Sequence, residues 1–239
     1  MSKLLMGATP GVCTAIAWRG TALETRCLTS TELADWYLPL RYDVLHRELN
    51  WTVSGVQTPV DLRDAYDQES ITFGVLNGTD LIGASRLILS ATGDDLPSLR
   101  LLRSHGRQHR FALPSAEISR VMVRQDFRKL GVFRILLLSS LLIAASAEVQ
   151  TLILSERDDA RSARIMVNCG FARFADGFSF VDEIIAPNEP AATYVLDVEG
   201  SLDTNARQAI AAHRDMLLRA AEALFTASLE NRAANSDPG

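Results

Sequence analysis

The chain has 239 residues, a mass of 26.2 kDa and a formal net charge of -5, with 47% hydrophobic and 22% charged residues. This length suits one large domain, or one domain with an extension, and the composition excludes an intrinsically disordered chain. The acidic balance argues against a nucleic-acid binder that depends on bulk positive charge, but it is compatible with a local basic groove.

The first 29 residues show no clear periodicity, and we predict a separate, partly irregular N-terminal segment there. Ser30 or Thr31 can cap a helix whose apolar residues continue at helical spacing to about residue 49. Pro39 predicts either a kink in this helix or the start of a second one. Residues 51–68 are expected to form a loop.

The rest of the domain, up to residue 200, alternates between strand-like and helix-like patterns. The predicted strands lie at 71–77, 81–89, 117–124, 151–157 and 192–198. The first two are joined at Asn77-Gly78, which is typical of a hairpin turn. A loop leads into a mostly buried helix that ends near residue 147, a second helix covers 159–171, and residues 90–113 are expected to be irregular. This order predicts a mixed α/β sheet with helices on both faces.

Beyond this domain, residues 201–232 are predicted to form a long amphipathic helix, and residues 233–239 a frayed tail. The helix can fold back on its own domain, or it can serve as a surface for a homodimer or another partner.

Cysteine usage and hydropathy exclude several other classes. Cys13, Cys27 and Cys169 are odd in number and far apart, so we expect neither a disulfide scaffold nor a metal site. The longest apolar run, 135–147, has about 13 residues against the roughly 20 of a membrane span. The first residues make a poor signal peptide. We therefore expect a soluble, cytoplasmic protein.

The segment VMVRQDFRKLGVF places a glycine and two basic residues between a strand and an apolar helix. Gly131 allows the backbone to approach a ligand closely, and the free N–H groups of the following helix favour an anion. Arg128 and Lys129 add positive charge. The unit is therefore a candidate phosphate-binding site, although many α/β proteins turn into a helix with a glycine.

The same segment resembles the acyl-CoA pyrophosphate loop of the GNAT superfamily of N-acetyltransferases, and SARIMVNCGF resembles its helix–strand signature. Phe133 stands at the second small position of the loop, and Met166 stands where the family often has the tyrosine that protonates the thiolate. The resemblance implies a GNAT-like fold that binds an acyl-phosphopantetheine donor. The residues that it assigns to the donor are Val121, Met122, Val123, Arg128, Lys129, Gly131 and Phe133.

A second pattern runs upstream through residues 41–120. It comprises Arg41, Trp51, Asp64, Asp67, Arg86, Glu117 and Arg120. This order is similar to that of acyl-homoserine-lactone synthases, and N-acyl amino acid synthases share it. The resemblance implies an acceptor amine on S-adenosylmethionine or an amino acid, an acyl carrier protein or acyl-CoA as donor, and a role in quorum sensing for the lactone product.

The six charges of this pattern balance three against three, and two of them lie in sequence that otherwise reads as sheet core. Buried ionic groups are costly unless paired, so their presence needs a reason. They either form an ion-pair network that pins the N-terminal helix to the sheet, or they build an acceptor pocket. The two interpretations are compatible.

With this resemblance, Glu117 is the predicted base for the acceptor amine, and backbone N–H groups at 121–123 are expected to stabilise the oxyanion. Ser155 is either an acid for the thiolate or an ordinary residue at a strand end, and we favour the second. Two other functions stay open. One is an ordinary acyl-CoA-dependent acetyltransferase acting on a small amine, and the other is a catalytically silent acyl-thioester-binding module.

Overall fold

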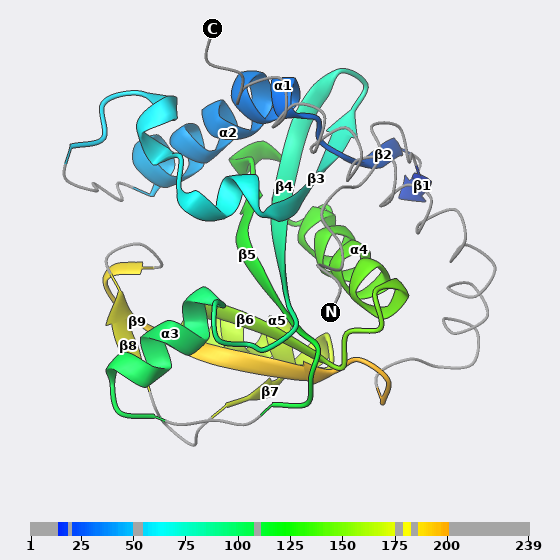
Figure 1. The fold of residues 1–239 in the computed structure, drawn as a ribbon. Helices are drawn as coiled ribbons and strands as arrows, with labels where there is room; N and C mark the ends of the chain where they lie inside the picture. Colours follow the sequence, from blue (N-terminus) through cyan, green and yellow to red (C-terminus); the bar gives the residue numbers. More distant parts are fainter. Residues whose placement is uncertain are drawn as a thin grey trace, which may run out of the picture.

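The computed structural model describes residues 14–18, 21–49, 55–107, 111–174, 179–182 and 186–200, which form a mixed sheet flanked by helices (Figure 1). The strand order is β1-β2-β3-β4-β5-β6-β9-β7, and β8 pairs with β9. Only β5 and β6 pair in parallel among these described strands. The strands are β1 (Thr14–Trp18), β2 (Thr21–Cys27), β3 (Ser70–Asn77), β4 (Asp80–Ser90), β5 (Ser115–Val123), β6 (Thr151–Arg157), β7 (Ala172–Arg173), β8 (Phe180–Asp182) and β9 (Ala186–Asp197). The predicted mixed α/β architecture is confirmed.

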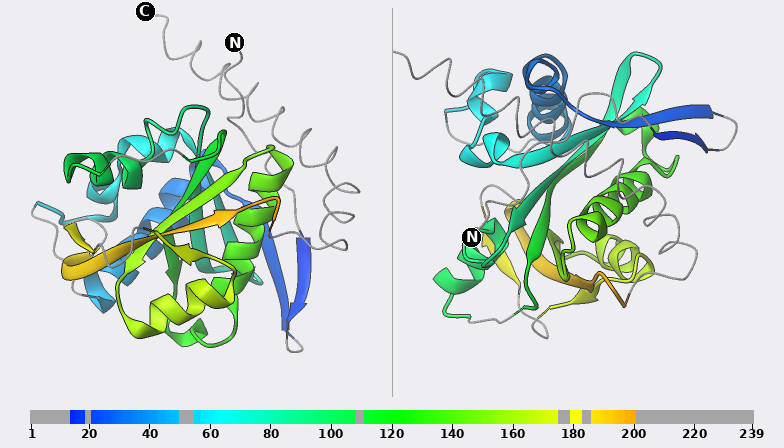
Figure 2. Two further views of the ribbon diagram at one scale, coloured as in Figure 1. Left: turned by 90° about the horizontal axis from the view of Figure 1, so that it is seen from below. Right: turned by 45° about the vertical axis from the view of Figure 1, so that its right-hand side comes forward.

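The helices divide between the two faces of this sheet, as the right-hand view of Figure 2 shows. One face carries α4 (Val132–Ser146) and α5 (Ala160–Asn168), which pack on the main core. The other face carries α3 (Pro97–Ser104) and a helical segment that runs from Ser30 to Glu48. This second face holds the charged residues that the sequence singles out.

The segment from Ser30 to Glu48 is helical throughout, with two wider stretches. It consists of α1 (Ser30–Glu32), the π-helical η1 (Leu33–Tyr37), α2 (Leu38–Tyr42) and the π-helical η2 (Asp43–Glu48). Thr29, not Ser30 or Thr31, is its N-cap, because Thr29 and Glu32 form a reciprocal capping box. Pro39, the second residue of α2, follows directly after the π-helical η1, so the helix continues through a proline that cannot donate a backbone hydrogen bond to the preceding turn, and the wider turn lies next to it.

Strand alternation decides which side chains of β5 meet which face. Ala116 and Ile118 join the main core beneath α4, whereas Glu117, between them, points to the face of α3. On the neighbouring strand, Gly83 lets α4 approach closely, because a Cβ there would lie 2.7 Å from Val132 Cγ1 and 3.1 Å from the Met122 carbonyl oxygen. The start of α4 is thereby held against β4 and β5.

Three predicted irregular regions contain regular structure. Within the first 29 residues, β1 and β2 form an antiparallel pair that adds to the edge of β3. The 51–68 region contains two 3-10 helices, η3 (Pro59–Leu62) and η4 (Ala65–Gln68). The 90–113 region contains α3, which packs through Leu99 and Leu102, together with Leu96 just before it, in a cluster with Ile88 and Ile153. These elements are short, so their patterns are weak in the sequence, and tertiary packing stabilises them.

The predicted helix over 201–232 and the tail over 233–239 lie outside the described residues.

Candidate active site

A network of buried ion pairs lies between the helical segment and the sheet, with Arg86 of β4 at its centre. Arg86 Nη1 donates to Asp64 Oδ1 at 2.5 Å and to Asp67 Oδ1 at 2.6 Å, and its Nε donates to Ser119 Oγ at 2.9 Å. The guanidinium also lies 5.6 Å from the centre of the Tyr66 ring. Arg86 is only 1% exposed, so these contacts replace its hydration shell.

Two further arginines bind the same pair of aspartates. From α2, Arg41 reaches Asp67 Oδ2 and Asp64 Oδ2, each at 3.2 Å, and from β5 Arg120 reaches Asp64 Oδ2 at 3.3 Å. Arg120 adopts a left-handed φ of 54° where the β4–β5 register shifts, and this irregularity accompanies its contact with Asp64. Among the described residues, the three arginines and two aspartates of this cluster give it one positive charge in excess.

Local sequence explains how the two aspartates are held. Asp64 is the N-cap of η4 and accepts from Tyr66 N, while Asp67 Oδ2 accepts from the Asp64 N–H, which completes a capping box. Burial raises the pKa of Asp64, but the hydrogen bond from Arg86 and the charges of all three arginines hold it well below its usual range. Asp64 therefore stays ionised at neutral pH.

Glu117 does not join this network, and the predicted cluster of six charges divides into five and one. Its carboxylate accepts from Ser98 N at 2.9 Å and from Ser98 Oγ at 2.8 Å, so it caps the first turn of α3. Burial raises the pKa of Glu117 to about 7, against the lowering effects of Ser98, Arg86 and Arg120. A carboxyl group with this pKa can take and return a proton near neutral pH.

The strands β5 and β6 part just beyond Glu117. Their parallel pairing runs from Ser115–Thr151 to Ile118–Leu154, whereas β5 continues to Val123 and β6 to Arg157. Figure 1 shows the two strands diverging. Arg124 N donates to Ile82 O of β4, so the alternation along β5 turns the N–H of Val123 toward the side that β6 has left.

The predicted phosphate-binding loop lies between β5 and α4. Gly131 is the N-cap of α4 with φ 88°, and Lys129 is exposed with φ 76°, so the unpaired N–H groups of the 15-residue helix and a lysine lie together. Arg128 instead pairs with Glu48 and donates from Nε to Val123 O at 3.0 Å. Phe133 is partly buried and packs against the main core. Binding of a phosphate by this loop stays a prediction.

Sequence reasoning missed Ser98, which joins Glu117 to a second hydroxyl on β6, Ser155. The available signal was Pro97 followed by Leu99 and Leu102 at helical spacing, since proline favours the first turn of a helix. Trp51 lies outside the described residues. Val121 and Met122, the other two residues assigned to the donor on β5, lie on the part of the strand that has left β6.

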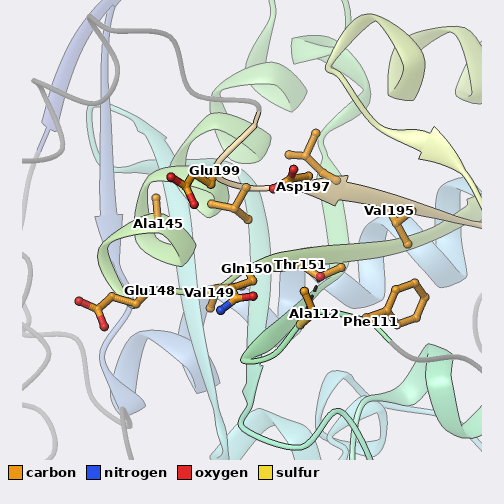
Figure 3. Close-up of a pocket in the computed structure, with 12 residues that line it drawn as sticks. Phe111, Ala112, Ala145, Glu148, Val149, Gln150, Thr151, Val195, Asp197 and Glu199 are labelled. Atoms are coloured by element: carbon orange, nitrogen blue, oxygen red, sulfur yellow. Dashed lines mark hydrogen bonds between the residues drawn. The ribbon is translucent and has the colours of Figure 1, made fainter.

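A separate pocket of about 750 Å³ lies at the opposite end of β6, where α4 ends and β9 finishes (Figure 3). Its lining includes Phe111, Val149, Thr151 and Val195, and Thr151 Oγ1 donates to Ala112 O at 2.9 Å. None of the predicted site residues lines it, so the pocket is not the predicted site.

Neither a metal site nor a membrane span is found in the described parts of the chain. No group of three or more histidine, cysteine, aspartate or glutamate residues is placed to hold a metal ion there, and no helix there has the length and hydropathy to cross a bilayer. Cys27 and Cys169 are unbonded.

Comparisons with known proteins agree with this fold. Residues 40–138 match the model of the acetyltransferase (GNAT) domain, whereas no curated protein matches the chain significantly. Among solved structures, FeeM, an N-acyl amino acid synthase from uncultured soil microbes, is 15% identical with a TM-score of 0.55, covering 77% of this chain and 97% of its own.

Two further solved structures have the same fold. BjaI, a CoA-dependent acyl-homoserine lactone synthase with SAM and isopentyl-CoA, is 16% identical with a TM-score of 0.54, covering 78% of this chain and 83% of its own. An acyl-CoA N-acyltransferase from Pseudomonas aeruginosa is 16% identical with a TM-score of 0.52, covering 73% of this chain and 99% of its own. At these identities the likeness establishes a GNAT-like fold for the chain, and residues 40–138 are the part that matches the acetyltransferase (GNAT) domain.

Proposed function

We propose that the protein transfers an acyl group from a phosphopantetheine thioester to the amine of an amino-acid-like acceptor. The observation that carries this proposal is the buried cluster of Arg41, Arg86, Arg120, Asp64 and Asp67, on the same face of the sheet as Glu117. Such a cluster adds little to the stability of a sheet core, because a fold with apolar residues in its place is often as stable. A binding site for an acceptor that carries both positive and negative groups would account for the cluster.

The charge of the cluster favours an acceptor that carries a carboxylate. The excess positive charge attracts an anion, and two buried donors nearby, Tyr37 Oη and Arg41 Nε, have no hydrogen-bond partner among the described residues. Buried donors without partners are costly, and a ligand carboxylate would satisfy them. Asp64, which is half-buried and ionised, would attract the ammonium or sulfonium group of the same molecule.

The donor would enter where β5 and β6 part. Lys129, the N–H groups at the start of α4 and the close backbone at Gly131 fit the phosphates of phosphopantetheine or CoA. The N–H of Val123 is then suited to hold the oxyanion that forms on the thioester carbonyl. Arg128 would hold this loop in place through Glu48 and would contribute less to the phosphate directly.

Glu117 would serve as the base. The amine must lose a proton as it attacks the carbonyl carbon, and a carboxylate with a pKa near 7 is matched to that task at neutral pH. Since Glu117 is 2% exposed, the proton would reach it through a hydroxyl or one water. An acyl carrier protein is our expected donor, with acyl-CoA as the alternative.

The test is a matrix of donors and acceptors followed by mass spectrometry of the amide product. Acetyl, hexanoyl and dodecanoyl groups are supplied on CoA and on an acyl carrier protein, with S-adenosylmethionine, the twenty amino acids and spermidine as amines. The proposal expects amides of amino acids or S-adenosylmethionine, with Glu117→Gln slower by about 10²–10⁴-fold and donor binding unchanged.

Three results would overturn it. Acetylation of spermidine alone would indicate an ordinary acetyltransferase, and tight donor binding without turnover would indicate a silent binding module. Full activity of Glu117→Gln would remove Glu117 from the role of base. A preference for the carrier-protein donor over CoA, or the reverse, decides the donor class.

A further inference from the structure

A chain of hydrogen-bonded hydroxyls leads away from Glu117 through three elements. Ser98 Oγ of α3 donates to Glu117 Oε1 at 2.8 Å, Ser98 Oγ lies 2.6 Å from Ser155 Oγ of β6, and Ser155 Oγ lies 3.1 Å from Thr193 Oγ1 of β9. The role proposed for Glu117 as a base assigns no proton to the leaving thiolate, so it leaves the function of this hydroxyl chain open. Buried hydroxyls in an unbroken chain can pass a proton, because each both donates and accepts.

The two ends of this chain lie in different environments. Glu117 is 2% exposed and Ser98 is fully buried, whereas Ser155 is half-buried. Ser155 is also the first residue of β6 after its last pair with β5, so it stands where the two strands part. The chain therefore connects a buried carboxyl to the point at which a thioester would enter.

Met166, which stands where GNAT enzymes often have a tyrosine, cannot protonate the leaving thiolate. Met166 lies on the opposite face of the sheet, 1% exposed within the main core, and a thioether has no proton to give. A thiolate that leaves between β5 and β6 needs another proton donor, and Ser155 is at the right place.

We propose that Ser155 is the catalytic acid that protonates the departing thiolate, and that Ser98 relays to it the proton that Glu117 has taken from the acceptor amine. This inference rests on the proposed function, in which Glu117 is the base. Ser155 would touch the reacting sulfur, and Ser98 would act as a positioning residue.

The step balances without any further reactant. The amine nitrogen forms a bond to the carbonyl carbon, the C–S bond breaks with its electron pair on sulfur, and the amine proton passes to the Glu117 carboxylate. The carboxyl proton then moves to Ser98 Oγ, the Ser98 proton moves to Ser155 Oγ, and the Ser155 proton moves to the thiolate. The products are the amide and a free thiol, with Glu117 ionised again.

A structural role for the same contacts predicts different kinetics. Ser98 and Glu117 together cap α3, so their loss can disturb the fold and lower every rate alike. A lost acid, in contrast, slows only reactions whose leaving thiolate needs a proton. The acidity of the leaving thiol therefore separates the two roles.

The experiment compares two donors with the same acyl group, the CoA thioester and the 4-nitrothiophenyl thioester, using the acyl group and amine with the highest turnover in the matrix above. The 4-nitrothiophenolate leaves without protonation. We expect Ser155→Ala and Ser98→Ala to lower kcat at least 100-fold with the CoA donor and less than threefold with the aryl donor. Ser155→Thr, which keeps a hydroxyl, should recover most of the loss.

Two variants serve as references. Glu117→Gln should be slow with both donors, because the amine still needs a base, and Ser140→Ala, a buried serine of α4 on the other face, should match the wild type with both. Equal losses with both donors in Ser155→Ala, or none with CoA, would overturn the relay while leaving the base in place. Full activity of Glu117→Gln, or no amide product from the wild type, would overturn the proposed function itself.

Discussion

The buried carboxyl of Glu117 predicts a specific dependence of stability on pH. Its pKa rises from 4.5 to about 7 on folding, mainly because burial penalises the charged form. Between these two values the folded chain keeps a proton that the unfolded chain releases, so raising the pH favours unfolding. At about 1.4 kcal/mol per pH unit, this group removes about 3 kcal/mol from the free energy of unfolding between pH 4.5 and 7.

Glu117→Gln should abolish this loss, because glutamine is neutral at every pH and has nearly the same shape. The assay is urea denaturation of both proteins at several pH values from 4 to 8, with free energies from linear extrapolation. The free energy of unfolding of the variant, minus that of the wild type, should grow by about 3 kcal/mol across this range. The difference between the two proteins cancels the titration of the other groups.

The control is the same substitution at an exposed residue, Glu69→Gln, measured over the same pH range. If the wild type and Glu117→Gln instead lose stability in parallel from pH 4.5 to 7, Glu117 is ionised in the folded protein at low pH. Its assignment as a base poised near neutrality would then be wrong.

Three further predictions concern the network and the loop. Asp67→Asn should lower the free energy of unfolding by about 3–5 kcal/mol, because it leaves two buried arginines short of a charge partner. Asp61→Asn, at the matching position of η3, should lower it far less, and equal losses in urea denaturation would contradict the network. Lys129→Gln should raise the KM of a CoA donor without lowering kcat, more so at low salt than at high salt, and a salt-independent effect would contradict phosphate binding. Gly131→Ala and Gly55→Ala both place a side chain at a left-handed φ, so each should lower the free energy of unfolding by about 1–2 kcal/mol. Only Gly131→Ala should also raise the KM of the donor.

The sequence predicted the parts of the fold in which local pattern and burial agree. The strand predicted over 117–124 and the apolar helix predicted after Gly131 follow from periodicity, and the structure has β5 over Ser115–Val123 and α4 over Val132–Ser146. The hairpin at Asn77-Gly78 follows from the one residue type that adopts a positive φ without strain. Short elements such as β1, β2 and α3 could not be predicted, because contacts with distant residues stabilise them.

The same distinction holds for the candidate site. The sequence by itself identified the charged residues, since arginine, aspartate and glutamate in apolar strands are costly and call for a reason. Only the tertiary structure decided how they pair: η4 brings Asp64 and Asp67 under Arg86, and α3 brings Ser98 to Glu117. Ser98 precedes Glu117 by 19 residues and Ser155 by 57, so no local pattern relates them, and only the packing of α3 across β5 and β6 brings their hydroxyl and carboxyl groups within hydrogen-bonding distance.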